Sequence, residues 1–329
     1  MVVVKEFELC FPQLLNISCR KPMQNLAKDI FLHVLLSCIS VLTVILNLLV
    51  IISISHFKQL HTPTNLLLLS LAVSDFLVGI LVMPIQIFHR RSCWFSGNML
   101  CGLYGYSSFF LTSASVGNMV LISVDRYVAI CDPLCYSRKV TSQRVQLCVG
   151  LCWACSVFYN GVILMDFMKN PDRYNSCYGD CVVLITSIKG AVDILVTFVG
   201  PVTVIIVLYM RVFVVAVSQA RAMRSHVTSV TKRSSVCVTK KSERKAARTL
   251  GIVVLVFLMC FCPYYYPSFA GEDNSASLEF SVFALWLLFC NSCLNPVVYA
   301  LFYPWFRRSM KLIVTLQIVK PNSCNVNIL

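Results

Sequence analysis

The chain has 329 residues, of which 58% are hydrophobic and only 13% are charged. An ordinary soluble domain is about 45–50% apolar and about 25% charged, so this composition excludes a typical soluble enzyme and indicates an integral membrane protein. The net charge of +14 would suit a nucleic-acid partner. The basic residues are grouped in separate segments rather than spread over one folded face, which argues against nucleic-acid binding.

Seven stretches carry few or no charges and are long enough to cross about 30 Å of hydrocarbon as helices. They lie at about 30–55, 65–88, 99–123, 146–168, 182–210, 249–270 and 278–302. A spanning β-barrel would show short alternating segments instead. The sequence therefore predicts an all-α membrane protein, a seven-transmembrane helix bundle over 30–302, after an external tail at 1–29.

Clusters of Lys and Arg predict which ends of the helices face the cytoplasm, because short cytoplasmic segments are enriched in these residues. The largest cluster lies in 221–248, and Arg307 and Arg308 follow the last stretch. We expect a multi-pass plasma-membrane protein with its amino terminus outside. Segment 303–329 should form a short amphipathic eighth helix on the inner membrane face and a cytoplasmic tail.

The external segments carry features typical of an oxidising compartment. Asn16 begins an Asn-Ile-Ser glycosylation acceptor in the tail. Disulfides are favoured outside the cell, and we expect two of them among four external cysteines, for which three pairings are open. These cysteines are Cys19, Cys101, Cys177 and Cys181.

Polar residues recur at similar depth in several apolar stretches. Asp75 lies in the second, Ser115 in the third, and Asn291, Ser292 and Asn295 in the seventh. Lipid offers them no hydrogen-bond partners, so they should face one another inside the bundle. One interpretation is a structural hydrogen-bonded cluster. The other is a site for a small cation, sodium, with Asp75 as its anionic ligand.

A charged motif ends the third stretch at the inner membrane boundary. Asp125, Arg126 and Tyr127 stand there, and Glu243 precedes the sixth stretch. Arg126 can pair locally with Asp125 or reach across to Glu243, which would form a latch between helices. The alternative is an ordinary arginine that extends toward water from a helix end.

These landmarks occur in order and resemble the rhodopsin-like G-protein-coupled receptors over about residues 25–315. A narrower resemblance is to the trace amine-associated receptors, whose terminal fingerprint is similar to NSCLNPVVYALFYPWF at 291–306, with Tyr299 in its Asn-Pro-Val-Val-Tyr motif. The resemblance implies a small-molecule ligand, a heterotrimeric G protein, no cofactor and no enzymatic activity. It also implies that Cys101 pairs with Cys181 and Cys19 with Cys177.

The departures from that family concern the amine anchor. The third-helix Asp that usually binds the ligand ammonium is Ser108 here, and the seventh-helix tyrosine that usually supports it is Phe289. Asp193 instead lies in the apolar fifth stretch, where an uncompensated charge costs about 3 kcal/mol. Some members of the family, notably in fish, are similar in carrying the carboxylate on the fifth helix.

Asp193 is therefore the candidate anchor for a protonated amine. Lys189, four residues earlier, could neutralise it on the same helix face, although Lys preceding the acid is the weaker orientation. Candidate neighbours are aromatic residues that attract a cation and hydroxyls that add hydrogen bonds, although each could equally serve core packing or bond its own backbone. They are Phe109, Tyr264, Tyr265, Trp286, Phe289, Thr112 and Thr197.

Two other functions fit part of this pattern. With Ser108 and Phe289 in place, the receptor could bind a ligand that is not an amine. A transporter could use Asp75 and Asp193 as intramembrane carboxylates, but it would be expected to show repeated halves and broken helices, and the sequence shows neither.

Overall fold

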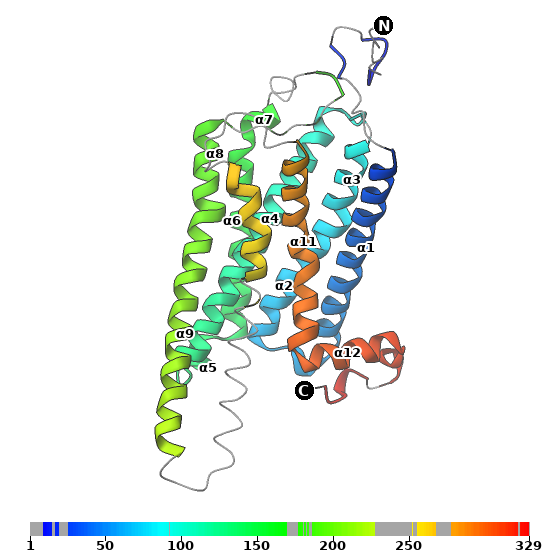
Figure 1. Ribbon diagram of the computed structural model, residues 1–329. Coiled ribbons are helices and arrows are strands. Elements are labelled where there is room, and N and C mark those ends of the chain that lie inside the picture. The colour runs from blue at the N-terminus through cyan, green and yellow to red at the C-terminus, as the bar shows by residue number, and fades with distance from the viewer. Residues whose placement is uncertain are drawn as a thin grey trace.

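A computed structural model describes residues 9–14, 17–19, 26–91, 93–169, 177–179, 181, 183, 186–227, 252, 255–267, 278–321 and 323–328. Long helices run side by side in one bundle, and a shorter helix, α12, lies across one end of it (Figure 1). The first described residues, 9–14, lie at the opposite end of the bundle from α12.

The first three spans are nearly continuous helices. They are α1 (Leu26–His56), then α2 (Pro63–Leu77) with the π-helical turn η2 (Val78–Val82) and α3 (Met83–Arg91), and then α4 (Gly97–Cys131). The start of α2 shows why the helix begins there. The Thr62 hydroxyl accepts a hydrogen bond from the backbone nitrogen of Asn65, and Pro63 takes the first turn, where its missing N–H costs nothing.

The second half of the bundle contains α6 (Ser142–Ile163) followed by α7 (Met165–Lys169), and a span built from α8 (Ser187–Asp193), the π-helical turn η4 (Ile194–Val199) and α9 (Gly200–Val227). The sixth span is described over Leu255–Pro267, and α11 (Leu278–Phe302) is the seventh. Six of the described helices are long and apolar enough to cross a membrane, and Leu255–Pro267 is a shorter apolar helix.

The all-α prediction is confirmed for the described residues, with two corrections to the bounds. The third and fifth helices reach Cys131 and Val227, beyond the expected ends near 123 and 210. Helices continue past the hydrocarbon where polar residues face water, and hydropathy alone does not register that extension.

Burial has the pattern of a membrane protein, with polar groups inside and large apolar groups outside. Asp75, Asn118 and Asn160 are fully buried, whereas Phe158 is 75% exposed and Phe213 is 65% exposed. Because lipid solvates apolar surfaces and not polar ones, the bundle exterior suits hydrocarbon.

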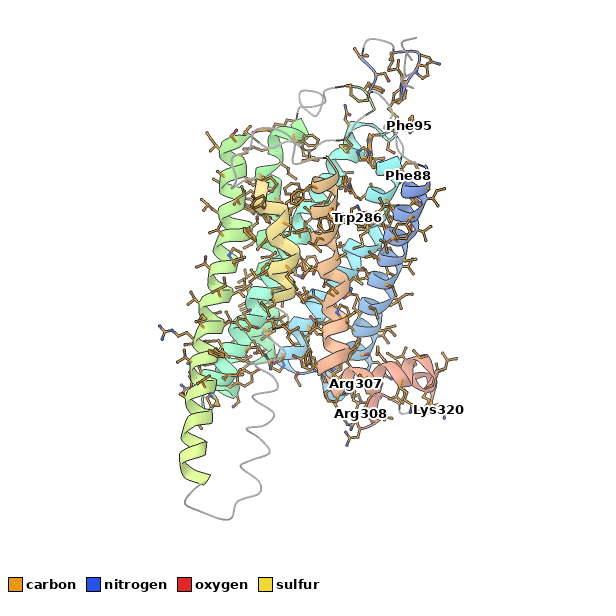
Figure 2. The ribbon with its side chains drawn as sticks, viewed as in Figure 1. Phe88, Phe95, Trp286, Arg307, Arg308 and Lys320 are labelled. Carbon is orange, nitrogen blue, oxygen red and sulfur yellow. A yellow bond between two sulfur atoms is a disulfide. The ribbon has the colours of Figure 1, made fainter. Side chains whose placement is uncertain are left out.

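The expected amphipathic helix is α12 (Pro304–Val314). Trp305, Phe306 and Ser309 are buried on one face, while Arg307 and Arg308 are exposed near its start, as labelled in Figure 2. The following segment was expected only to be a tail.

That segment instead folds back beneath the bundle through two short 3₁₀ turns, η5 (Gln317–Val319) and η6 (Ser323–Asn325). Ser323 Oγ lies 2.9 Å from His56 Nε2, and Ile328 is 1% exposed. Its backbone nitrogen donates to Gln59 Oε1 at 3.3 Å. The contacts tie the tail to the turn after α1.

Three disulfides close the outer end of the bundle. The structure contains the two expected pairs, Cys101–Cys181 and Cys19–Cys177. The third pair, Cys10–Cys93, was missed. Both of its cysteines lie in segments that the topology already placed outside, so counting six external cysteines instead of four could have found it.

Backbone hydrogen bonds also join the external segments that the disulfides connect. The nitrogen of Cys19 donates to the carbonyl oxygen of Tyr178 at 2.9 Å, and that of Trp94 donates to Gly179 at 2.9 Å. Gly179 has φ of 108°, and a Cβ there would lie 3.0 Å from Cys10 Cβ. Only glycine suits this close approach.

Candidate functional site

A small cavity of about 40 Å³ lies between the third, fifth, sixth and seventh spans. Its wall combines one carboxylate with hydroxyl and aromatic groups. The lining residues are Ser108, Phe109, Thr112, Ser113, Val116, Asp193, Thr197, Tyr264, Tyr265, Leu285 and Leu288. Seven of the nine residues proposed as ligand contacts therefore share one cavity, although their contact with a ligand stays a prediction.

Asp193 ends α8 and is 7% exposed. Its Oδ1 accepts a hydrogen bond of 3.3 Å from the hydroxyl of Tyr159 on α6. Its Oδ2 accepts no hydrogen bond from a described side chain. Thr197 Oγ1 donates instead to the backbone oxygen of Asp193 at 2.7 Å and lies 3.2 Å from the Tyr265 hydroxyl. One carboxylate oxygen is thus held and the other is left open.

Lys189 does not neutralise Asp193 in this structure. Its Nζ lies 2.7 Å from Asp166 Oδ2 and 3.4 Å from the carbonyl oxygens of Val162 and Ile163. Asp166 lies in the first turn of α7 and its side chain is half exposed, so the pair forms at the outer rim of the bundle. The structure thus contradicts the interpretation in which Lys189 is the partner of Asp193.

Trp286 and Phe289 are the two proposed contacts that do not line this cavity. They pack against each other on α11 with ring centroids 5.9 Å apart, and both are buried in the apolar core. Figure 2 places Trp286 in the outer half of the bundle. Leu285 and Leu288 take the cavity-facing positions of α11. This placement agrees with the alternative that was left open, core packing.

Sequence reasoning missed Tyr159 and Ser113. Tyr159 lies on α6 between the lipid-exposed Phe158 and the buried Asn160, so its sequence neighbours give no single pattern. Asn160 Nδ2 donates to Ser113 Oγ at 3.0 Å, which places α6 directly behind the cavity wall. The available signal was a run of polar and aromatic side chains in an otherwise apolar span.

The second buried carboxylate, Asp75, lies in the mid-membrane cluster predicted from the sequence. Asp75 Oδ1 accepts hydrogen bonds from Ser292 Oγ at 2.8 Å and Ser115 Oγ at 3.2 Å. Its Oδ2 accepts from Asn295 Nδ2 at 2.8 Å. Three neutral donors from two other helices therefore surround this carboxylate.

Asn291 is the predicted cluster member that makes no hydrogen bond to Asp75. It is 2% exposed, and its Oδ1 has no hydrogen-bond partner. A buried amide oxygen, a carboxylate and two hydroxyls would together be a suitable ligand set for a hard cation. Sodium binding here stays a prediction.

The inner motif forms a compact network at the end of α4. Arg126 Nε donates to Asp125 Oδ2 at 2.9 Å, and its Nη2 also bonds Thr64 at the start of α2. Tyr136, on the short helix α5 (Tyr136–Lys139), donates to Asp125 Oδ1 at 2.8 Å. Burial raises the pKa of Tyr136, so the phenol stays protonated as a donor. The local pairing that the sequence left open is the one present here.

The remaining predicted residues of the inner motif, of the latch and of the Asn-Pro-Val-Val-Tyr motif differ in burial and in whether the structure describes them. Tyr127 is half-buried, and Tyr299 is 2% exposed with no hydrogen-bond partner for its hydroxyl. Glu243 and the glycosylation acceptor Asn16 lie outside the described residues. The latch between Arg126 and Glu243 and the glycosylation of Asn16 stay predictions.

Comparisons with known proteins extend over nearly the whole chain. Residues 46–299 match the family described as 7 transmembrane receptor (rhodopsin family). Trace amine-associated receptor 13c of Danio rerio is 37% identical over 98% of this chain and 96% of its own length. Trace amine-associated receptor 1 of Mus musculus is 37% identical over 94% and 96%, and receptor 6 of Homo sapiens is 34% identical over 98% and 95%.

Proposed function

Because the chain belongs to the trace amine-associated receptors of the rhodopsin family, we propose that it senses a small amine whose ammonium group pairs with Asp193. The family assignment makes the chain a multi-pass membrane receptor rather than an enzyme or a transporter. The relatives carry trace amines in their names. The ligand class proposed for this chain is argued from the residues that line its own cavity.

One observation carries the proposal: Asp193 is buried in the cavity wall with one carboxylate oxygen open and no cationic partner among the described residues. An ammonium group in the cavity would form a charge-assisted hydrogen bond with that oxygen, which is the strong kind of polar contact. The ligand would supply the compensating charge that the protein does not.

The rest of the cavity wall suits the remainder of such a ligand. Phe109, Tyr264 and Tyr265 are aromatic, and aromatic ring faces attract a cation and pack against apolar carbons. Ser108 and Thr112 are short and neutral, so they leave Asp193 as the acidic group of this cavity. A cavity of about 40 Å³ favours a compact ligand with one charged end.

Signalling would follow from a shift between two arrangements of the bundle. The network of Arg126, Asp125 and Thr64 would belong to the resting arrangement. Its rearrangement would open an inner surface for a heterotrimeric G protein, with the basic segment 221–248 as partner surface and as contact with anionic lipid. We place the receptor in the plasma membrane with its amino terminus outside, as the disulfides and the positive-inside pattern support.

The mid-membrane cluster is proposed as an allosteric sodium site. Asp75 would supply the charge, and Ser115, Ser292 and the open Oδ1 of Asn291 would supply neutral oxygens. Sodium would then favour the resting arrangement over the active one, provided that it binds the two with different affinity.

The experiment is a panel of primary, tertiary and aromatic amines, each matched with a neutral isostere, in cells with a cAMP reporter. The proposal expects activation by at least one amine and none by its isostere at the same concentration, because the isostere cannot pair with Asp193. If neutral compounds activate as well as amines do, the alternative of a non-amine receptor replaces this proposal.

A further inference from the structure

The hydroxyl of Tyr159 approaches the amine anchor from a helix that contributes nothing to the cavity lining. Tyr159 stands on α6, and its hydroxyl lies 3.3 Å from Asp193 Oδ1. The cavity-lining residues come from the third, fifth, sixth and seventh spans. Tyr159 therefore contacts the carboxylate without being a lining residue of the cavity.

This contact holds one of the two carboxylate oxygens. Oδ1 accepts from Tyr159, and no other described side chain makes a hydrogen bond of ordinary geometry to the carboxylate, although the Thr197 hydroxyl lies close to it. The Thr197 hydroxyl is already committed to the backbone oxygen of Asp193, and Lys189 is committed to Asp166. Among the described side chains, Tyr159 is thus the group that fixes the rotation of the carboxylate.

We propose that Tyr159 is a positioning residue that fixes the rotation of the Asp193 carboxylate in the cavity wall, and that it thereby determines how substituted an amine the receptor accepts. The inference rests on the proposed function of Asp193. In this role Tyr159 takes the place of the seventh-helix tyrosine that would support a carboxylate on the third helix, since those two positions are Phe289 and Ser108 here.

The specificity follows from counting donors. A tertiary ammonium has a single N–H, so it depends on the orientation of the one oxygen that accepts it. A primary ammonium has three N–H groups, so it can hydrogen-bond the carboxylate in several orientations. Loss of the Tyr159 hydroxyl would let the carboxylate rotate, which should cost a tertiary amine more affinity than a primary amine.

The test is Tyr159→Phe, which deletes the hydroxyl and keeps the ring. Dose-response curves are measured for a primary amine and its N,N-dimethyl derivative at matched surface expression. For the tertiary amine, the half-maximal concentration should rise about 5- to 30-fold with an unchanged maximal response. For the primary amine, the rise should be about threefold or less. A merely structural role would shift both amines equally.

Tyr106→Phe is the matched control. Tyr106 also links α4 to α6, through a hydrogen bond of 2.9 Å from its hydroxyl to the carbonyl oxygen of Val157, but it makes no contact with Asp193. We expect its half-maximal concentrations to match the wild type for both amines. If Tyr159→Phe does not reach the surface, competition binding of the two amines to membranes of the expressing cells replaces the dose-response curves, and the same difference between the amines is expected.

The outcomes separate this inference from the function on which it rests. Equal shifts for the two amines in Tyr159→Phe, or curves identical to those of Tyr106→Phe, overturn the role of Tyr159. Asp193→Asn is measured in parallel. If it retains the wild-type amine response, the anchor itself is wrong. If it abolishes the response while Tyr159→Phe behaves as wild type, only the positioning role fails.

Discussion

The two buried carboxylates of the bundle differ in how completely the protein satisfies them. Asp75 is 0% exposed and accepts hydrogen bonds from Ser115, Ser292 and Asn295. Asp193 is 7% exposed, accepts one side-chain hydrogen bond, and borders a cavity. Both residues are aspartates in apolar spans, and their surroundings give them different chemistry.

The difference between the two carboxylates indicates which of them is available to a ligand. Burying a charge is costly unless hydrogen bonds or an opposite charge compensate it. At Asp75 the protein supplies most of the compensation from its own helices, so loss of the carboxylate should damage the fold. At Asp193 the protein supplies little, so loss of the carboxylate should spare the fold and damage ligand binding.

The largest expected effect is that of Asp75→Ala. The variant leaves the hydroxyls of Ser115 and Ser292 and the amide of Asn295 without their acceptor, and each unsatisfied buried donor costs about 1–3 kcal/mol. We expect a large fall in surface expression and in the thermal unfolding temperature of purified receptor. Expression at the wild-type level would show that the fold depends on Asp75 no more than on Asp193.

Removal of a disulfide should affect ligand binding at the Asp193 cavity and not sodium binding at the Asp75 cluster. Cys101–Cys181 closes a separation of 80 residues over the outer end of α4, and such bonds typically contribute about 2–4 kcal/mol. Cys101→Ser should abolish the amine response of the protein that reaches the surface. Sodium binding at the Asp75 cluster should raise the unfolding temperature of the wild type, and this rise should survive in Cys101→Ser. Its loss would show that the two sites are not independent.

Asp75→Asn should have a smaller effect on folding and a specific one on sodium. The amide keeps the shape of the carboxylate but removes the charge that a cation needs. We expect the sodium dependence of agonist binding to disappear, while the unfolding temperature falls less than in Asp75→Ala. Potassium chloride at equal ionic strength is the control, and sodium dependence that persists in the variant would contradict the site.

The smallest effect is expected for Lys189→Met. The Lys189–Asp166 pair is partly exposed, with side chains 28% and 50% exposed, and such pairs contribute about 0–1 kcal/mol. Amine potency should change by less than about threefold. Asp166→Asn is the matched variant and should behave alike. A loss of response as severe as that of Asp193→Asn would restore Lys189 as the partner of Asp193.

Much of the fold was predictable because its signals are local. Long apolar runs predicted the spans, and NPVVY and the external cysteines indicated the family. Clusters of basic residues predicted the orientation, which stays a prediction. Asp75 and its partners were predictable because polar residues at equal depth have only each other to bond. The seven cavity-lining contacts were found from depth and resemblance together.

What the sequence could not give depends on helix rotation and on chain folding between distant segments. Trp286 and Leu285 are neighbours, but only Leu285 lines the cavity, and the difference is one helical step of about 100°. In the fifth span, the π-helical turn Ile194–Val199 directly after Asp193 changes the angle between successive side chains, so the facing of that helix cannot be read from a regular period. The contact of Tyr159 with Asp193 and the return of Ser323 to His56 join residues that no local pattern connects.

The most direct test of the account is the response of Asp193→Asn to the best amine of the panel, measured beside surface expression. Asparagine keeps the shape and removes the charge, so the receptor should reach the surface near the wild-type level. Its half-maximal concentration should rise by about two to four decades, since loss of one partner of a buried charge pair costs about 3–5 kcal/mol. A half-maximal concentration equal to that of the wild type would contradict the assignment of Asp193 as the amine anchor.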